Sequence, residues 1–145
     1  MCAGSACGMS RRRLFGAAGV AGAAALGVSA CGSPQDGPAP WERLRGTVIA
    51  RTDEVPVGGG TIVIDGKMVL TQPAEGDFKA FSAVCTHAGC TIQEVERTIH
   101  CLCHGSEFDV STGDVLKGPA VEALRELPIT VANGEITLDE DAPAR

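Results

Sequence analysis

The sequence predicts a small all-β domain, sandwich or barrel-like, on three observations. Short runs of alternating or β-branched residues recur between turn signals, and no long stretch shows the 3.6-residue apolar period of a helix. The 145 residues include 19 glycines and only 3% aromatics, which favours many turns around a core of Val, Ile, Leu and Ala. A chain of this length with 44% hydrophobic residues can bury one core, so we expect one domain with extensions.

Residues 1–30 have the layout of an export signal rather than of a domain. In "SRRRLFGAAGVAGAAALGVSAC" a twin arginine precedes a stretch of Ala, Gly and Val that ends at Ala30. This stretch is too short and too weakly apolar to predict a transmembrane helix. The pattern resembles the twin-arginine export signal, which handles proteins already folded with their cofactor. Met9 is an alternative start.

The end of this segment, "VSAC", resembles the lipobox of bacterial lipoproteins, in which the cysteine receives the lipid. The resemblance implies lipidation at Cys31; simple cleavage after a small residue and an uncleaved anchor are the alternatives. Residues 31–44 contain the Pro- and Gly-rich "GSPQDGPAP" and predict a flexible tether. We therefore expect a domain at the outer, extracytoplasmic face of a bacterial cell membrane, held there by a lipid or signal anchor.

Charge is unevenly distributed along the chain. The formal net charge is −6, but Arg11, Arg12 and Arg13 supply three of the twelve basic residues, so the part from residue 31 onward has nine against eighteen acidic ones. A surface of this sign is a poor nucleic-acid binder, and anionic lipid head groups repel it. It suits a basic docking partner or an ordinary solvated face.

The domain, expected over residues 45–145, is a succession of short strands. Asn133-Gly134 lies between two alternating runs in "LPITVANGEITLDE", the signature of a β-hairpin. "VGGG" and "DGK" are turn signals between earlier runs. The earlier runs are "TVIA" at 47–50, "TIVID" at 61–65, "KMVLTQ" at 67–72 and "FKAFSAV" at 78–84.

Of the seven cysteines, Cys2 and Cys7 lie in the export segment and Cys31 follows it. The other four cysteines and all three histidines lie in two short segments between "FKAFSAV" and the hairpin. These segments are "CTHAGC", residues 85–90, and "HCLCHGS", residues 100–106. Ligand-type residues concentrated in two loops predict a site that the scaffold supports, within residues 83–120.

Several kinds of site are compatible with these residue types. Two structural disulfides are possible in an exported protein, but they leave His87 and His104 unexplained. Covalent c-type haem needs C-x-x-C-H, and "CLCH" is one residue short. Zinc accepts Cys and His, but its sites use four ligands at other spacings, whereas six candidates are present here. A non-redox disulfide or zinc lipoprotein therefore remains an alternative.

The two loops together resemble the Rieske family of iron–sulfur proteins. C-x-H is followed after 13 residues by C-x-x-H, with a second cysteine in each loop. The resemblance, over roughly residues 45–145, implies an antiparallel β-sandwich with two cluster-binding loops and one 2Fe-2S cluster. It implies that Cys85 and Cys101 bind one iron and that His87 and His104 bind the other.

The resemblance extends to the second pair of cysteines and to the redox chemistry. Cys90 and Cys103 match the disulfide of the exported, high-potential branch, which would stiffen the loops. Neutral histidine ligands raise the potential to about −150 to +300 mV, against about −400 mV for a ferredoxin with four cysteines. Because reduction adds negative charge, electron uptake is expected to be coupled to proton uptake at His87 or His104.

Neighbouring residues refine this expectation. Ser106 matches the family's serine whose hydroxyl donates to a bridging sulfide, and "KGPA" at 117–120 resembles the Pro-containing loop that covers the cluster. Phe108 stands where high-potential members have a Tyr that donates to a ligand sulfur, so we expect a lower potential than in Tyr-bearing members. Ala88 and Leu102 replace the Leu and Pro usual in quinol-oxidising members.

These features predict a single-electron carrier without a nucleophile–base pair of its own. One hypothesis is the iron–sulfur subunit of a cytochrome bc-type complex, which takes electrons from quinol in partnership with cytochrome b and a c-type cytochrome. The second is an electron-transfer subunit or free carrier for another exported oxidoreductase, such as a molybdenum enzyme. His100 is interpreted as a structural or surface residue, and Gly89 and Gly105 as residues needed for tight loop geometry.

Overall fold

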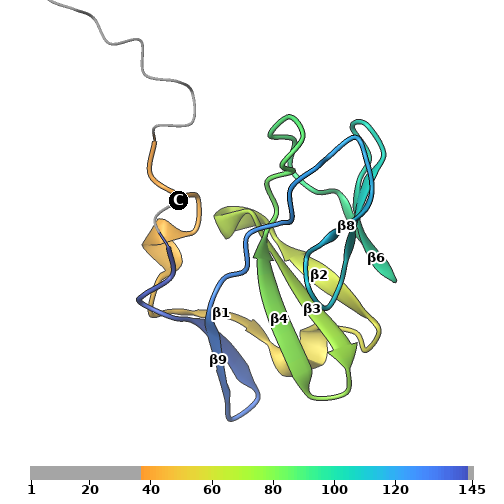
Figure 1. The fold of residues 1–145 in the computed structure, drawn as a ribbon. Helices are drawn as coiled ribbons and strands as arrows, with labels where there is room; N and C mark the ends of the chain where they lie inside the picture. Colours follow the sequence, from red (N-terminus) through yellow and green to blue (C-terminus); the bar gives the residue numbers. More distant parts are fainter. Residues whose placement is uncertain (1–36, 144–145) are drawn as a thin grey trace, which may run out of the picture. The chain divides into compact units, whose positions relative to one another are not determined.

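The computed structural model describes residues 37–143, which fall within one compact unit, Pro34–Arg145. They form three antiparallel sheets joined by short turns and single 3-10 turns, as Figure 1 shows. None of the helices in residues 37–143 has the length and apolar character needed to cross a membrane. The strands are β1 (Val48–Arg51), β2 (Gly59–Val63), β3 (Met68–Ala74), β4 (Asp77–Ser82), β5 (Glu94–Val95), β6 (Thr98–Cys101), β7 (Ser106–Asp109), β8 (Val115–Lys117), β9 (Ile129–Ala132) and β10 (Glu135–Leu138), and the 3-10 turns are η1 (Glu42–Leu44), η2 (Thr52–Glu54) and η3 (Ile64–Gly66).

The first sheet, in the order β1-β10-β9, contains the predicted C-terminal hairpin. Asn133 and Gly134 have φ of 53° and 79°, so both central residues of the turn are left-handed, as a two-residue hairpin turn of this kind requires. β10 pairs with β9 from Glu135 opposite Ala132 to Leu138 opposite Ile129. β1 adds to the other edge of β10, which joins the start of the domain to its end.

In the middle sheet, with the order β2-β3-β4, the central strand β3 is buried on both sides over most of its length. Met68 and Leu70 of β3 pack into one apolar cluster with Ile136 and Leu138 of the first sheet. Val69, between them, points the other way into a second apolar cluster. Because both faces are covered, the run "MVLT" is fully buried and lacks the alternation of a half-exposed strand.

The third sheet, in the order β5-β6-β7-β8, lies in a region that sequence analysis interpreted mainly as loops. β5 and β8 have two and three residues, too few for a period to be recognised. The inner face of this sheet contributes Ile99 and Phe108 to the second apolar cluster. This sheet carries the second loop between β6 and β7, and Figure 1 shows it beside the middle sheet.

The structure corrects the expected boundary between tether and domain. Within the described part of residues 31–44, Ala39 and Trp41 are only 4% and 3% exposed and belong to the first apolar cluster. The Trp41 indole N–H also donates to the carbonyl of Pro143 at 2.9 Å. Burial of so large an aromatic side chain stabilises the packed chain, so the folded unit begins before residue 45. The predicted signal at 1–30 and the predicted lipidation site Cys31 lie outside the described residues.

Candidate metal centre

The first loop begins where β4 ends and closes on itself by backbone hydrogen bonds. The N–H of Cys85 donates to the carbonyl of Cys90 at 2.8 Å, and the N–H of Gly89 donates to the carbonyl of Cys85 at 2.9 Å. Gly89 has a φ of +73°, a left-handed conformation that most residues adopt only with strain. The turn therefore depends on glycine, as the sequence predicted.

The second loop, between β6 and β7, repeats this arrangement. The N–H of Gly105 donates to the carbonyl of Cys101 at 2.9 Å, and Gly105 has a φ of +78°. In both loops, therefore, a cysteine carbonyl accepts from a left-handed glycine four residues later. This shared geometry fixes each candidate cysteine at the base of its loop and leaves the histidine on the turn.

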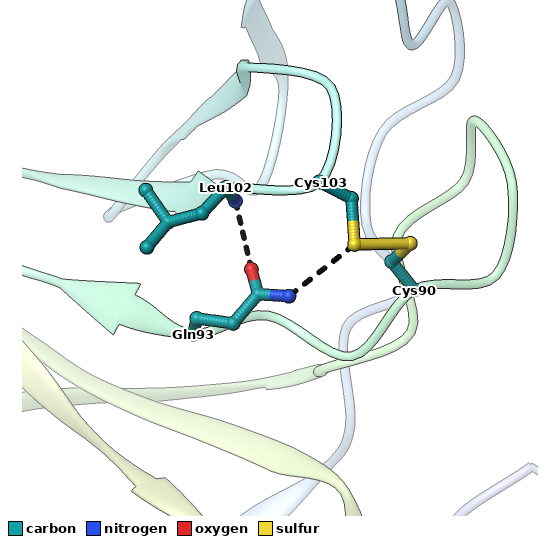
Figure 2. Close-up of a disulfide and its surroundings, with 4 residues drawn as sticks. All are labelled: Cys90, Gln93, Leu102 and Cys103. Carbon is teal, nitrogen blue, oxygen red and sulfur yellow. Dashed lines mark hydrogen bonds between the residues drawn. A yellow bond between two sulfur atoms is a disulfide. The ribbon is translucent and has the colours of Figure 1, made fainter.

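A disulfide joins the two loops. Cys90 and Cys103 are bonded through their sulfur atoms, with Cα atoms 6.6 Å apart, within the range that a disulfide spans. Figure 2 shows this bond with its neighbours Gln93 and Leu102. The pairing that the resemblance implied is confirmed.

The other two cysteines are buried free thiols. Cys85 and Cys101 are 2% and 1% exposed, and both belong to the second apolar cluster. Burial raises the pKa of the Cys101 thiol, as does its hydrogen bond with Cys85, whereas backbone hydrogen bonds from Cys103 and His104 lower it. The net direction is a raised pKa, because burial of the thiol is the largest of these effects and the backbone N–H groups offset only part of it.

The two histidines lie on the outer side of these thiols. The imidazole rings of His87 and His104 have centroids 4.8 Å apart and meet edge to face at 80°. Both residues are exposed, in contrast with the buried cysteines. The site thus has a buried sulfur side and a solvent-facing nitrogen side.

The residues fit a two-iron cluster with mixed ligands better than they fit a single metal ion. Among the described residues, the sulfur of Cys101 comes within 4.8 Å of the sulfurs of Cys90 and Cys103. Those two sulfurs are bonded to each other, so they are not available as thiolate ligands. Two buried thiols and two adjoining imidazoles remain, which is the donor set of a Rieske centre.

A third segment, residues 118–122, is tied to both loops. The buried hydroxyl oxygen of Ser106 accepts a hydrogen bond of 3.0 Å from the N–H of Ala120. The hydroxyl of Thr86, next to Cys85, donates to the carbonyl of Glu122 at 2.7 Å. The predicted "KGPA" segment is therefore held against the base of the site by one contact from each loop.

Phe108 lies two residue pairs further along the same strands, on the same face as Ser106. In the register of β6 and β7, Cys101 is opposite Ser106 and Ile99 is opposite Phe108, and alternate residues share a face. Phe108 is fully buried in the cluster that contains Cys85 and Cys101. It thus stands on the sulfur side of the site and carries no hydrogen-bond donor there.

His100 belongs to a charged row on the outer face of the third sheet. Its Nδ1 lies 3.2 Å from Glu94, and Glu107 in the next strand pairs with Lys117 at 3.0 Å. The hydrogen bond from Lys117, helped by attraction to Lys117 and His100, lowers the pKa of Glu107. Since neighbouring residues in a strand point to opposite faces, His100 points away from Cys101 and lies outside the site, as expected.

Two contact residues escaped sequence analysis, Gln93 and Thr86. Gln93 accepts from the N–H of Leu102 at 2.7 Å and donates to the sulfur of Cys103 at 3.4 Å. No motif signals either residue, because each acts on a segment distant in sequence. A ligand search by residue type also passes over an amide and a hydroxyl.

Comparisons with known proteins agree with this geometry. The family model described as the Rieske [2Fe-2S] domain matches residues 46–128. The iron–sulfur subunit of a cytochrome b6-f complex from Chlorobaculum thiosulfatiphilum is 30% identical over 103 residues, 63% of this chain and 56% of that protein. The Rieske iron–sulfur subunit of a cytochrome bc1 complex from Corynebacterium diphtheriae is 47% identical over 60 residues, 39% of this chain and 15% of that protein.

A further relative and two solved structures extend the comparison. A Haloferax mediterranei protein, provisionally named as the Rieske subunit of a respiratory nitrate reductase, is 43% identical over 67 residues, 45% of this chain and 30% of that protein. The chain thus spans less than two thirds of each of these relatives. A ferredoxin from Sphingomonas yanoikuyae B1 superposes with a TM-score of 0.54 at 22% identity, over 66% of this chain and 98% of that one. A chain of a hyperthermophilic respiratory complex III superposes with a TM-score of 0.54 at 22% identity, over 72% of this chain and 80% of that one.

The two structural likenesses show the fold, an antiparallel β domain of Rieske type. The family match covers more than half of the chain and includes both loops and the segment after them. Rieske domains carry one [2Fe-2S] cluster and transfer electrons through it. On these grounds the chain belongs to the Rieske [2Fe-2S] domain family.

Proposed function

We propose that this protein passes single electrons as the iron–sulfur subunit of a quinol-oxidising cytochrome bc-type complex or a relative of one. The observation that carries the proposal is the polarity of the site. Cys85 and Cys101 are 2% and 1% exposed, whereas His87 and His104 face solvent with rings 4.8 Å apart. A donor or acceptor can therefore approach the histidine side directly, while the protein shields the sulfur side.

The four side chains have different tasks in this proposal. Cys85 and Cys101 would hold one iron and His87 and His104 the other, and the bound cluster supplies one-electron uptake and release. The backbone donors at Cys101 would stabilise the thiolate that binds metal. Each imidazole has two nitrogens, so a ring that binds metal through one keeps the other for exchanging a proton with solvent.

Single substitutions test this ligand set. His87→Ala and His104→Ala should each abolish the paramagnetic signal of the reduced two-iron cluster and lower the iron content of the purified full chain. His100→Ala is the matched control, because His100 pairs with Glu94 outside the site. A His104→Ala protein that keeps the wild-type signal would remove His104 from the ligand set.

Two lines of support favour a quinol-oxidising complex. The cytochrome b6-f and bc1 subunits share 30% and 47% identity with the matched parts of this chain. The disulfide that braces the loops is also present, as in the high-potential branch that the sequence resembles. Cytochrome b and a c-type cytochrome are the partners that this role requires, with quinol as the electron donor.

The midpoint potential between about pH 5 and 10 is the decisive measurement for this role. Rieske potentials range from about −150 to +300 mV, so the measured value distinguishes a high-potential from a low-potential member of the family. The proposal expects a value well above zero that falls as pH rises, since reduction is coupled to proton uptake. The full chain with its cluster should then accept electrons from a quinol-oxidising membrane extract and pass them to a c-type cytochrome. A value near the bottom of the range that does not change with pH until strongly alkaline conditions would contradict it.

A second candidate is an electron-transfer subunit or carrier for another exported oxidoreductase, such as a molybdenum enzyme. The 43% identity to the Haloferax mediterranei protein supports it, as do Ala88 and Phe108 at positions where quinol-oxidising members have Leu and Tyr. This candidate expects the low, pH-independent potential. It also expects no electron uptake from quinol under conditions in which an added low-potential donor reduces the cluster.

The site of action is proposed to be the outer face of the cytoplasmic membrane. The twin arginine and the lipobox-like "VSAC" support export and lipidation at Cys31. Mass spectrometry of the mature protein should find a diacylglycerol-modified Cys31 at its N-terminus, and Cys31→Ala should move the protein from the membrane fraction to the soluble fraction. An unmodified Cys31 at the N-terminus would instead show simple cleavage after Ala30.

A further inference from the structure

The backbone N–H of Leu102 loses its expected strand partner in the third sheet. β5 and β6 pair through Glu94 opposite His100, and the N–H of Gln93 still reaches the carbonyl of His100 at 3.4 Å. Beyond that point the chain leaves the ladder, because the N–H of Ile92 bonds to the carbonyl of Ala83 at 2.7 Å instead. Among residues 37–143 the structure records no backbone carbonyl that accepts a hydrogen bond from the N–H of Leu102.

The side chain of Gln93 takes over this role. Its amide oxygen accepts from the N–H of Leu102 at 2.7 Å, and its amide nitrogen donates to the sulfur of Cys103 at 3.4 Å. Figure 2 shows the amide group between these two atoms, next to the disulfide. One side chain thus forms hydrogen bonds with two consecutive residues, Leu102 and Cys103, that lie between Cys101 and His104.

We propose that Gln93 is a positioning residue that holds the second cluster loop independently of the disulfide. The disulfide attaches that loop to Cys90 through Cys103, and the Gln93 amide attaches it to the entry of β5 through Leu102. The two attachments hold adjacent residues of the same loop. If one attachment is lost, the other still restricts the movement of that loop. The inference rests on the proposed ligation by Cys101 and His104.

This arrangement has a functional consequence for the state in which Cys90 and Cys103 are not bonded. A newly made chain passes through that state, since a disulfide forms only in an oxidising compartment. With Gln93 in place, the backbone from Leu102 to His104 keeps its course, and Cys101 and His104 stay oriented toward Cys85 and His87. Gln93 thereby allows the cluster to bind and remain bound before the disulfide closes.

The test is a double-mutant cycle on the full chain, comparing wild type, Gln93→Leu, Cys90→Ala and the double variant. Cys90→Ala removes the disulfide but keeps the Cys103 sulfur that Gln93 contacts. The readouts are the visible circular dichroism of the cluster and the rate at which its colour is lost to an iron chelator under anaerobic conditions. Glu96→Leu is the control, since the structure records no side-chain hydrogen bond for exposed Glu96 among residues 37–143.

Gln93→Leu should leave the spectrum and the loss rate nearly unchanged when the disulfide is present. In the Cys90→Ala background it should alter the spectrum and speed cluster loss roughly five- to tenfold, as expected for losing hydrogen bonds of ordinary net strength. Equal acceleration in both backgrounds would show a merely structural role and overturn the inference, and so would no acceleration in either.

Two further measurements keep the test decisive if the double variant fails to fold. With the disulfide intact, the Leu102 amide should exchange its hydrogen faster in Gln93→Leu than in wild type. Gln93→Glu keeps the acceptor for Leu102 and should restore slow exchange, and an unprotected Leu102 amide in wild type would overturn the inference. A wild-type chain that binds no cluster would instead refute the proposed ligand set, so the two failures are distinguishable.

Discussion

The buried hydroxyl oxygen of Ser106 lies 3.0 Å from the backbone nitrogen of Ala120 and accepts its hydrogen bond. These residues come from β7 and from the segment that follows β8, so the contact fastens that segment to the second cluster loop. Accepting this bond still leaves the hydroxyl proton able to donate elsewhere. One side chain can thus hold the segment of residues 118–122 in place and still donate to a bound cluster.

Ser106→Ala should both destabilise the protein and lower the midpoint potential. The buried N–H of Ala120 would lose its acceptor, a cost of about 1–3 kcal/mol, and the reduced cluster would lose a donor. Denaturant unfolding and redox titration measure the two effects. Ser111→Ala is a suitable control, because exposed Ser111 lies in the turn after β7. An unchanged potential in Ser106→Ala would refute the donor role.

Phe108→Tyr should raise the midpoint potential. Phe108 shares the inner face of β7 with Ser106, so a hydroxyl added there enters the sulfur side of the site. A charge-assisted donor to a ligand sulfur should add about 1–2 kcal/mol of electron affinity, or roughly 40–90 mV for one electron. Phe78→Tyr, on β4 against the other apolar cluster, is the control. The hydrogen-bond account fails if both variants have the wild-type potential.

Thr86→Val should remove the contact that ties the first loop to the segment of residues 118–122. The hydroxyl of Thr86 donates to the carbonyl of Glu122 at 2.7 Å, and valine keeps the shape but not the donor. The expected loss in unfolding free energy is about 0.5–1.5 kcal/mol, with faster hydrogen exchange in residues 118–124. Thr91→Val, directly after the same loop, should leave that exchange unchanged. Identical exchange in both variants would contradict the proposed tie.

Lys117→Met should lower the stability of the protein at neutral pH and make that stability less sensitive to acid. Lys117 lowers the pKa of Glu107 below its ordinary 4.5 by donating a hydrogen bond to it. When folding lowers the pKa of a group, that group stabilises the folded state at pH values above its pKa in the unfolded chain. This contribution is lost as the pH falls through the pKa of the group in the folded state. The stability difference between wild type and variant should therefore exist at neutral pH and vanish in acid. Thermal unfolding at several pH values from about pH 7 to pH 3 measures this stability difference, with Lys67→Met as the control. A stability difference that persists in acid would contradict the ion pair between Lys117 and Glu107 as its cause.

Local patterns in the sequence predicted much of the scaffold, and the family resemblance implied the pairing of the loops. The run over residues 67–72 became β3, and Asn133-Gly134 became a two-residue hairpin turn, because alternation and left-handed turn residues are encoded in neighbouring positions. The resemblance of the two loops to the Rieske family implied which residues come together. Cys90 and Cys103 are bonded, and the rings of His87 and His104 are in contact range.

The sequence by itself thus determined the all-β fold class, the hairpin turn and the residue types of the site. Only the tertiary structure decided which polar side chains complete it, because the contacts of Gln93 with Leu102, Ser106 with Ala120 and Thr86 with Glu122 join separate segments. It also decided that Trp41 packs on the domain, since burial depends on the surface that β10 and its neighbours present. A local pattern specifies backbone conformation, but a contact between distant segments depends on how the sheets pack, and no short stretch encodes that packing.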